Sequence, residues 1–170
     1  MWPIEARENP LHANLYLAPV ARHLAANHAL IAHLRGAGRS ETEVLALILT
    51  ETFFRDKLHR ILEYSAWIIF SMVWPARVGR LSVGISQVQL RHWVHLGYLQ
   101  DPQPRFASLR TAMCPKANYD VCKSFLVSAG VELSNHRRMV TAYCGEGRAY
   151  HHQVLCAFIA ALRIFGRQGV

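Results

Sequence analysis

The chain has 170 residues, of which 52% are hydrophobic and 18% are charged. A single domain of this size and composition can bury a substantial core, which excludes a wholly disordered chain and a small fold stapled by disulfides or metals. Nineteen Lys and Arg residues oppose eleven Asp and Glu, giving a net charge of +8, and 16 of the cations are arginines. Because guanidinium groups bind phosphate and carboxylate well, we expect a polyanionic partner: nucleic acid, an acidic membrane or an anionic cell wall.

The sequence pattern of the N-terminal third predicts two helices. Residues 1–8 contain no basic segment followed by an apolar run, so we expect no secretory signal peptide. Apolar spacing from Pro19 to Arg35, followed by Gly36, predicts the first helix. Ser40-Glu41-Thr42-Glu43 has the form of a capping box, in which Ser40 and Glu43 begin the second helix. That helix continues with an apolar stripe at helical spacing: Val44, Leu47, Ile48, Phe54 and Leu58.

The rest of the chain is also helical in pattern and shows no alternating strand pattern. Residues 66–74 are strongly apolar, but nine residues cannot span a bilayer, which takes about 20, so we interpret them as part of a buried core helix with no membrane span. Residues 77–82 predict a loop or short extended piece, and residues 101–104 predict a linker. The fold class is therefore mainly α, in one compact domain. The remaining predicted helices are Arg60–Trp74, Gln87–Leu99, Tyr119–Ala129, Asn135–Tyr143 and Tyr150–Phe165.

Cysteine and histidine spacing does not indicate a metal or redox site. The four cysteines contain no C-x-x-C pair, and both disulfide pairing and four buried free thiols are compatible with the sequence. His23, His28 and His33 are spaced by five residues, which does not align them on one helical face. We therefore expect neither a metal nor a cofactor. The cysteines are Cys114, Cys122, Cys144 and Cys156.

Glu51 lies on the apolar stripe of the second predicted helix. Desolvation favours the protonated form of a carboxylate, and a carboxylic acid with a raised pKa can act as a general acid at neutral pH. Cleavage of a glycosidic bond requires such an acid. The alternative is an ordinary i,i+4 ion pair between Glu51 and Arg55.

Four short segments resemble, in order, the motifs of lytic transglycosylases and goose-type lysozymes. They are Glu51-Thr52-Phe53-Phe54, Gly84-Ile85-Ser86-Gln87-Val88, Asn118-Tyr119-Asp120-Val121 and Ala142-Tyr143-Cys144-Gly145, and the similarity extends over about residues 40–160. The chain departs from the family pattern with Thr52 in place of Ser, Cys144 in place of Asn, Ser86 where Met is frequent, and a longer interval between Glu51 and Gly84.

This resemblance implies a lysozyme-like helical catalytic domain over residues 40–165, preceded by an N-terminal helical extension over residues 1–39. It also implies cleavage of the bond between N-acetylmuramic acid and N-acetylglucosamine in peptidoglycan. In the family's lytic transglycosylases one Glu serves as acid and then as base while the sugar's own 6-hydroxyl attacks, which gives a 1,6-anhydro product. The resemblance implies that role for Glu51, and substrate binding or positioning by Ser86, Gln87, Asn118, Tyr143 and Tyr150.

A two-carboxylate hydrolysis needs a second acidic group near the site. Glu146, which lies close to Tyr143 in the sequence, is the candidate, although an exposed charge in a glycine-rich turn is the simpler interpretation. The substrate would be peptidoglycan strands in the periplasm or cell wall. The protein would reach them by a route other than the general secretion pathway or as part of a larger protein, for instance as a lysin or as a toxin with an immunity protein.

Residues 84–99 admit a second interpretation. Gly84-Ile85-Ser86, Leu90-Arg91-His92-Trp93 and Leu96-Gly97-Tyr98-Leu99 resemble the recognition-helix region of mercury-resistance-type regulators, with Gln87 to Trp93 in the major groove of DNA. Arg80 stands where that motif needs a small residue, and Glu51 would have no role, so nucleic acid is the less favoured partner. A non-enzymatic wall-binding protein on the same fold is a further alternative.

Overall fold

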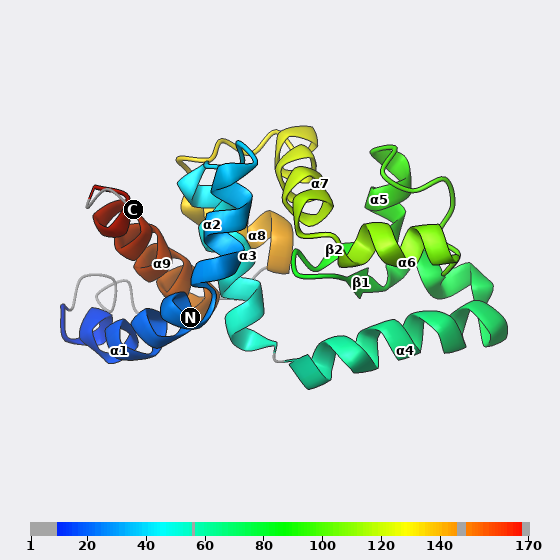
Figure 1. Cartoon of the computed structure of the whole chain (residues 1–170), viewed down its shortest axis with the longest axis horizontal. Helices are drawn as coiled ribbons and strands as arrows, with labels where there is room; N and C mark the ends of the chain where they lie inside the picture. The colour runs from blue at the N-terminus through cyan, green and yellow to red at the C-terminus, as the bar shows by residue number, and fades with distance from the viewer. Residues whose placement is uncertain (1–9, 56, 146–148, 168–170) are drawn as a thin grey trace.

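The computed structural model describes residues 10–55, 57–145 and 149–167, which are mainly helical and include a single two-stranded sheet (Figure 1). The expected fold class, mainly α, is confirmed. The elements are α1 (Pro10–Ala26), α2 (His28–Gly36), α3 (Thr42–Phe54), α4 (Lys57–Val73), the 3-10 helix η2 (Pro75–Arg80), β1 (Ser82–Val83), β2 (Val88–Gln89), α5 (Leu90–His95), α6 (Phe106–Met113), α7 (Pro115–Ser128), α8 (His136–Cys144) and α9 (Ala149–Arg167).

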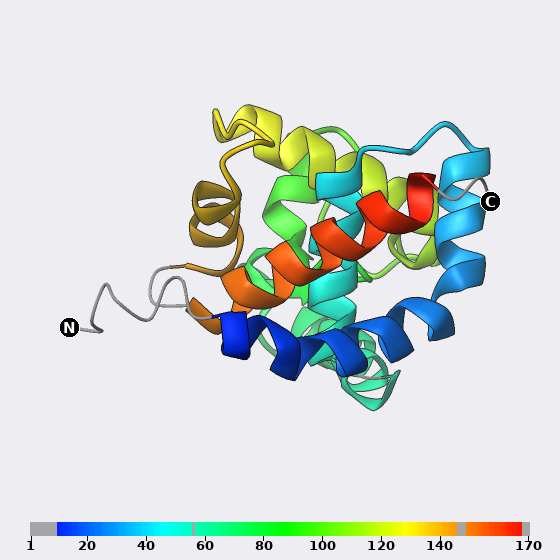
Figure 2. The same ribbon diagram turned by 90° about the vertical axis from the view of Figure 1, so that its left-hand side faces the viewer.

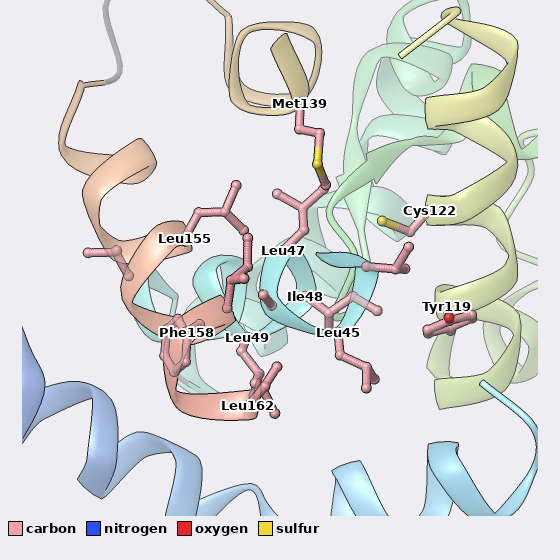
Figure 3. Close-up of a cluster of buried hydrophobic side chains, with 14 of the residues drawn as sticks. Leu45, Leu47, Ile48, Leu49, Tyr119, Cys122, Met139, Leu155, Phe158 and Leu162 are labelled. Carbon is pink, nitrogen blue, oxygen red and sulfur yellow. The ribbon is translucent and has the colours of Figure 1, made fainter. Parts of the chain in front are cut away.

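Helix α3 is the centre of the larger core. Every residue from Val44 to Thr52 is buried, and a helix that is buried on all sides must be enclosed by others. Helices α1, α7 and α9 pack around it, with α9 crossing it between α1 and α7 (Figure 2). Figure 3 shows side chains of α9 on one side of α3 and those of α7 on the other: Leu155, Phe158 and Leu162 against Leu45, Leu47, Ile48 and Leu49, with Tyr119 and Cys122 opposite.

A second core lies between α4, the hairpin, α5, α6 and α7. Trp67 and Trp93 are fully buried in it, and the Trp67 indole donates a hydrogen bond to the carbonyl of Pro102 at 2.7 Å. Helix α7 joins the two cores, because Val121 faces the second core and Cys122 faces the first. The residue 101–104 segment expected as a linker is irregular, and this hydrogen bond fixes it to α4.

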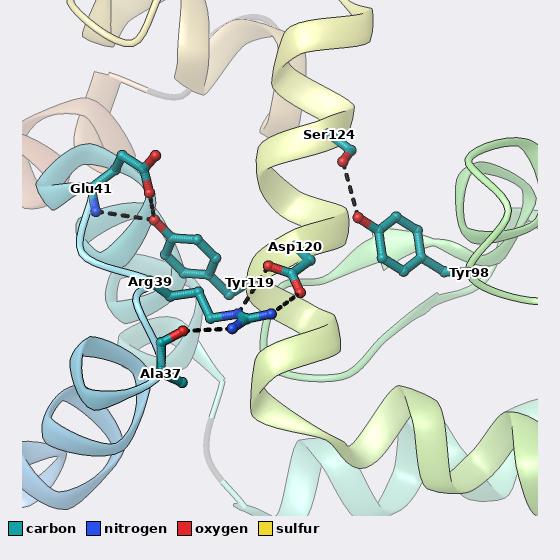
Figure 4. A network of polar contacts seen from close by, with 7 residues as sticks. All are labelled: Ala37, Arg39, Glu41, Tyr98, Tyr119, Asp120 and Ser124. Atoms are coloured by element: carbon teal, nitrogen blue, oxygen red, sulfur yellow. Dashed lines mark hydrogen bonds and ion pairs between the residues drawn. The ribbon is translucent and has the colours of Figure 1, made fainter.

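A polar network ties the segment before α3 to α7 (Figure 4). The Arg39 guanidinium binds both carboxylate oxygens of Asp120, at 3.0 and 2.6 Å. The Tyr119 hydroxyl donates to the Glu41 carboxylate and accepts the Glu41 backbone N–H at 3.0 Å. Side chains of α1 and α2 belong to the same core as those of α3, so the residues before 40 pack directly against the residues after 40. The proposed division at residue 40 stays a prediction.

The N-terminal helix and the capping box differ from expectation. The helix expected from Pro19 to Arg35 is two helices that meet at Asn27, where φ is −106° and ψ is 13°. The expected capping box does not form: Glu41 is the N-cap, without a side-chain cap bond, because its carboxylate binds Tyr119 and Lys123. Glu43 is likewise engaged, in an ion pair with Arg163 at 2.8 Å.

The helix that carries Glu51 is shorter than the apolar stripe suggested. It ends at Phe54, because Arg55 adopts an extended conformation with φ −132° and ψ 108°. Leu58 therefore belongs to α4, where its side chain is 63% exposed, and it is not part of the buried stripe.

Two further expectations about the middle of the chain were wrong. The apolar segment 66–74 is only half buried, since Trp67 faces the core while Ile69 and Met72 are exposed. The helix expected from Gln87 to Leu99 begins only at Leu90, because Val88 and Gln89 pair with Val83 and Ser82 in a hairpin, and Gln87 lies in its turn. Helix α6 was not anticipated. None of the helices in the described ranges has both the length and the apolar character needed to cross a bilayer.

Candidate active site

Glu51 lies in the last turn of α3, and only 4% of its surface is exposed. The thiol of Cys144, at the end of α8, donates a hydrogen bond to Glu51 Oε1 at 3.2 Å. Glu51 is therefore buried, as expected, although every residue of α3 from Val44 to Thr52 is buried too.

The ion pair that helical spacing suggested for Arg55 is replaced by a different one. Because the helix ends at Phe54, Arg55 turns toward Glu63 of α4 and binds its Oε1 at 2.9 Å. Arg55 also donates to Gln87 Oε1, and Gln87 Nε2 donates to Glu63 Oε2 at 2.7 Å. These three side chains form a closed network beside the hairpin turn.

The hairpin turn at residues 84–87 is held against α7 by Asn118. The Asn118 side-chain oxygen accepts bonds from the Ser86 backbone N–H and hydroxyl at 3.2 and 3.0 Å, and its amide donates to the carbonyls of Ala112 and Cys114. Ser86 and Asn118 are 0% and 1% exposed. Both residues therefore support the site from behind and do not present their side chains to a ligand.

Gln87 is held in a strained conformation. Its φ is +55°, in the left-handed region that residues other than glycine seldom adopt. Its side chain is nonetheless fixed by bonds to Glu63 and to the Gly84 carbonyl, both at 2.7 Å. Strain of this kind persists only where surrounding contacts enforce it, and it concentrates at functional sites.

Tyr143 lies at the other side of the hairpin turn. Its ring packs edge to face against Phe125, with centroids 5.7 Å apart, and it lines a surface hollow together with Gln87. Burial raises the pKa of Tyr143 well above its usual value, and the nearby Cys122 and Glu51 add to the shift. The hydroxyl is therefore protonated, and it faces the side chains of Cys122 and Ser86.

The start of α9 completes the surroundings of Glu51. Phe54 packs against His151 and Tyr150, with ring centroids 4.1 and 5.2 Å apart, and Tyr150 is 45% exposed. Donor atoms of Glu51, Cys144 and His151 all lie within 4.8 Å of one another. The site thus gathers the ends of α3 and α8 and the beginning of α9.

The structure brings Glu51 together with Tyr143, and Tyr150 joins them through Phe54. Glu146, the candidate second carboxylate, lies outside the described residues. Sequence reasoning did not find His151, because it belongs to no recognisable motif. Cys114, Cys122, Cys144 and Cys156 are free thiols in the structure, but only Cys122 is buried, so the expectation of four buried free thiols holds in part. Burial raises the pKa of Cys122 to about 12, so this thiol is protonated.

The helix-turn-helix interpretation of residues 84–99 does not fit the geometry. Residues 82–83 are a strand where the motif needs a preceding helix, and α5 is only six residues long. Leu90 and Trp93 of α5 are fully buried, so they cannot read a groove.

We compared the chain with models of protein families, with curated proteins and with solved structures, and none of them matches.

Proposed function

We propose that this protein is a lysozyme-like lytic transglycosylase that cleaves peptidoglycan between N-acetylmuramic acid and N-acetylglucosamine, with Glu51 as its only acid and base. The supporting observation is that a carboxyl group with 4% exposure at the end of a helix is surrounded by segments that are distant in sequence. Tyr143 and Cys144 come from one of the motifs that resemble the family, and the Gln87 turn beside Tyr143 comes from another.

The proposed chemistry requires the buried Glu51 carboxyl group to give up a proton and then to take one back. Glu51 gives its proton to the glycosidic oxygen as the bond to the muramic acid C1 breaks. The Glu51 carboxylate then accepts the proton of the 6-hydroxyl while that oxygen bonds to C1. The product is a 1,6-anhydro sugar, no water is consumed, and Glu51 returns to its protonated form. The Cys144 thiol, 3.2 Å from Oε1, stabilises the transient carboxylate by a hydrogen bond.

The other carboxylates within residues 10–55, 57–145 and 149–167 support a mechanism with one acid. Glu63, the acidic residue nearest to the Gln87 turn, is held by Arg55 at 2.9 Å and by the Gln87 amide at 2.7 Å, so it is not free to attack a sugar. Glu132 is exposed between α7 and α8. The remaining paired carboxylates are Glu41 with Lys123, Glu43 with Arg163, Asp101 with Arg105 and Asp120 with Arg39.

The partner in this proposal is the glycan strand of peptidoglycan, in the periplasm or cell wall. A net charge of +8 favours association with an anionic wall. If the chain is a toxin, an immunity protein that covers Glu51 is the expected second partner.

The test is mass analysis of the fragments that the purified protein releases from peptidoglycan sacculi. We expect soluble muropeptides with 1,6-anhydro ends, and a loss of about 10²- to 10⁴-fold in the rate of release for Glu51→Gln. Glu132→Gln is the matched control, because it removes an exposed carboxylate and should retain the wild-type rate.

Two results contradict the proposal. Equal release by Glu51→Gln and wild type would remove Glu51 from the chemistry. Fragments with ordinary reducing ends, in which water has added to C1 of the muramic acid, would show hydrolysis instead.

A further inference from the structure

Three potential metal ligands converge at the candidate active site from three different helices. Glu51, Cys144 and His151 each offer a donor atom, and these atoms lie within 4.8 Å of one another. The Cys144 sulfur is 3.2 Å from Glu51 Oε1. Glu51 is buried and the other two residues are half-buried, so the group is partly accessible from the surface.

These distances suit a small tetrahedral cation. In zinc sites the metal lies about 2.3 Å from sulfur and about 2.0 to 2.2 Å from nitrogen or oxygen, so that neighbouring ligand atoms are about 3.3 to 3.6 Å apart. The Cys144 sulfur and Glu51 Oε1 are already close to this separation. The His151 nitrogen lies within 4.8 Å of both, and rotation of its side chain that moves the nitrogen by about 1 Å brings it to the same separation. A thiolate and a carboxylate also neutralise a divalent charge, which suits a site that is largely removed from water.

We propose that Glu51, Cys144 and His151 form a zinc site, and that the bound ion inhibits the enzyme. The binding rests on the geometry alone, whereas the inhibition rests on the proposed function. A carboxylate that coordinates zinc cannot hold the proton that glycosidic cleavage requires. Binding releases the thiol proton, so zinc affinity should rise with pH.

Cobalt(II) tests the binding without any measurement of activity. Titration of the purified chain with Co²⁺ should produce a thiolate-to-cobalt charge-transfer band at one equivalent, and Zn²⁺ should abolish it because it binds such sites more tightly. Cys144→Ser should lose the band, and His151→Gln should weaken binding by at least about tenfold. Cys114→Ser removes a thiol that is not part of the group and should keep the band. A band that survives in Cys144→Ser, or no band in a folded wild type, overturns the proposal.

Muropeptide release with and without zinc tests the inhibition separately. The rate with zinc divided by the rate without zinc should fall well below one in wild type and in Cys114→Ser, and a chelator should bring it back to one. In Cys144→Ser this ratio should stay closer to one. An inactive protein that still shows the cobalt band would refute the proposed function and retain the metal site. An active protein without the band would refute the metal site and retain the proposed function.

A second, independent observation concerns the outer face of α4. This helix runs along the edge of the molecule (Figure 1), and most of its large apolar side chains face solvent. They recur at intervals of three, four and seven residues, so they share one face of the helix, opposite the buried Trp67. Their exposed fractions are 63% for Leu58, 62% for Ile61, 58% for Leu62, 38% for Ile68, 56% for Ile69, 74% for Met72 and 58% for Val73.

The charge around this stripe favours an anionic bilayer. Glu63 is the only acidic residue of α4, and it is paired with Arg55. The exposed Trp74 and the exposed cations Arg77 and Arg80 follow the helix, and the whole chain carries +8. A second copy of the chain would bring equal charge to the interface, whereas anionic headgroups complement it. The geometry points to α4 lying in the headgroup region of an anionic membrane, with its stripe toward the acyl chains.

Vesicle sedimentation tests this inference. The protein should pellet with phosphatidylglycerol-containing vesicles, remain in the supernatant with pure phosphatidylcholine, and be partly released by 0.5 M salt, at which the Debye length falls to about 4 Å. Ile69→Glu and Met72→Glu should each abolish pelleting. Val127→Glu, on α7 at 66% exposure, is the matched control and should pellet like wild type. The membrane inference is overturned if the protein does not pellet with anionic vesicles. It is also overturned if the protein is a dimer in solution and Ile69→Glu dissociates that dimer.

Discussion

Replacement of Gly84 by alanine tests how the hairpin turn is held against α7. A Cβ atom at this position would lie 2.1 Å from Asn118 Oδ1 and 2.8 Å from the carbonyl oxygen of Ala112. Neither contact is tolerable, and the carbonyl belongs to the backbone. Asn118 would therefore have to move away, which breaks its two bonds with Ser86.

The expected cost can be summed from its parts. Gly84 has φ +77°, and a left-handed conformation costs a residue with a side chain about 1 to 2 kcal/mol. Each lost bond from Ser86 adds about 1 kcal/mol. We expect Gly84→Ala to lower the free energy of unfolding by about 3 to 4 kcal/mol, which for a chain of this size lowers Tm by about 10 °C.

Urea denaturation followed by tryptophan fluorescence measures this loss, with Gly97→Ala as the control. Gly97 has φ +78°, almost the same as Gly84, but no atom lies within 4 Å of its would-be Cβ. Its substitution should therefore cost only the conformational part, about 1 to 2 kcal/mol. In the double mutant Gly84→Ala/Asn118→Ala the loss of stability should be less than the sum of the two single losses, because Asn118→Ala already removes the side chain that the new Cβ would meet. Equal losses for the two glycine variants would refute the argument.

Three more predictions concern stability. Burial lowers the pKa of His23 from its ordinary 6.5, so as the pH falls the unfolded state takes up this proton before the folded state does. The free energy of unfolding should therefore decrease as the pH drops from 7.5 to 5, and the Tm of the wild type should fall more over this range than the Tm of His23→Gln. Tyr119→Phe removes the hydroxyl that binds Glu41 and should cost about 1.5 to 3 kcal/mol by urea denaturation; a loss below 0.5 kcal/mol would contradict this. Trp67→Phe leaves the Pro102 carbonyl without its indole donor and should cost at least about 1 kcal/mol; an unchanged unfolding midpoint would show that this bond is not stabilising.

Helical periodicity was sufficient to predict the fold class and the two helices that form the main core. A continuous apolar run after a capping motif predicts α3, and apolar residues at helical spacing predict α9. The hairpin could not be found in this way, because its strands are two residues long and carry no alternation. The exposed face of α4 was also beyond reach, since apolar composition does not say which face is covered.

The candidate site was predictable only in part. The buried environment of Glu51 followed from its place on the apolar stripe, but the partner of Arg55 did not, because the break after Phe54 removes Arg55 from helical register. Ser86 and Asn118 were expected to bind or position substrate, and their complete burial assigns their hydrogen bonds to the hairpin instead. His151 approaches Glu51 only through the packing of α9 across α3, a contact between residues about 100 positions apart.

The burial of α3 has a consequence for how the chain folds as it is synthesised. Every residue from Val44 to Thr52 is buried, largely by α9, whose residues begin at Ala149. At a translation rate of about 5 to 20 residues per second, α3 leaves the ribosome about 5 to 20 s before the helix that covers it exists. During that interval its apolar surface must be shielded by α1 or by a chaperone. The residues around Glu51 can come together only after α9 has been made, so the candidate site forms late relative to the helix that carries Glu51.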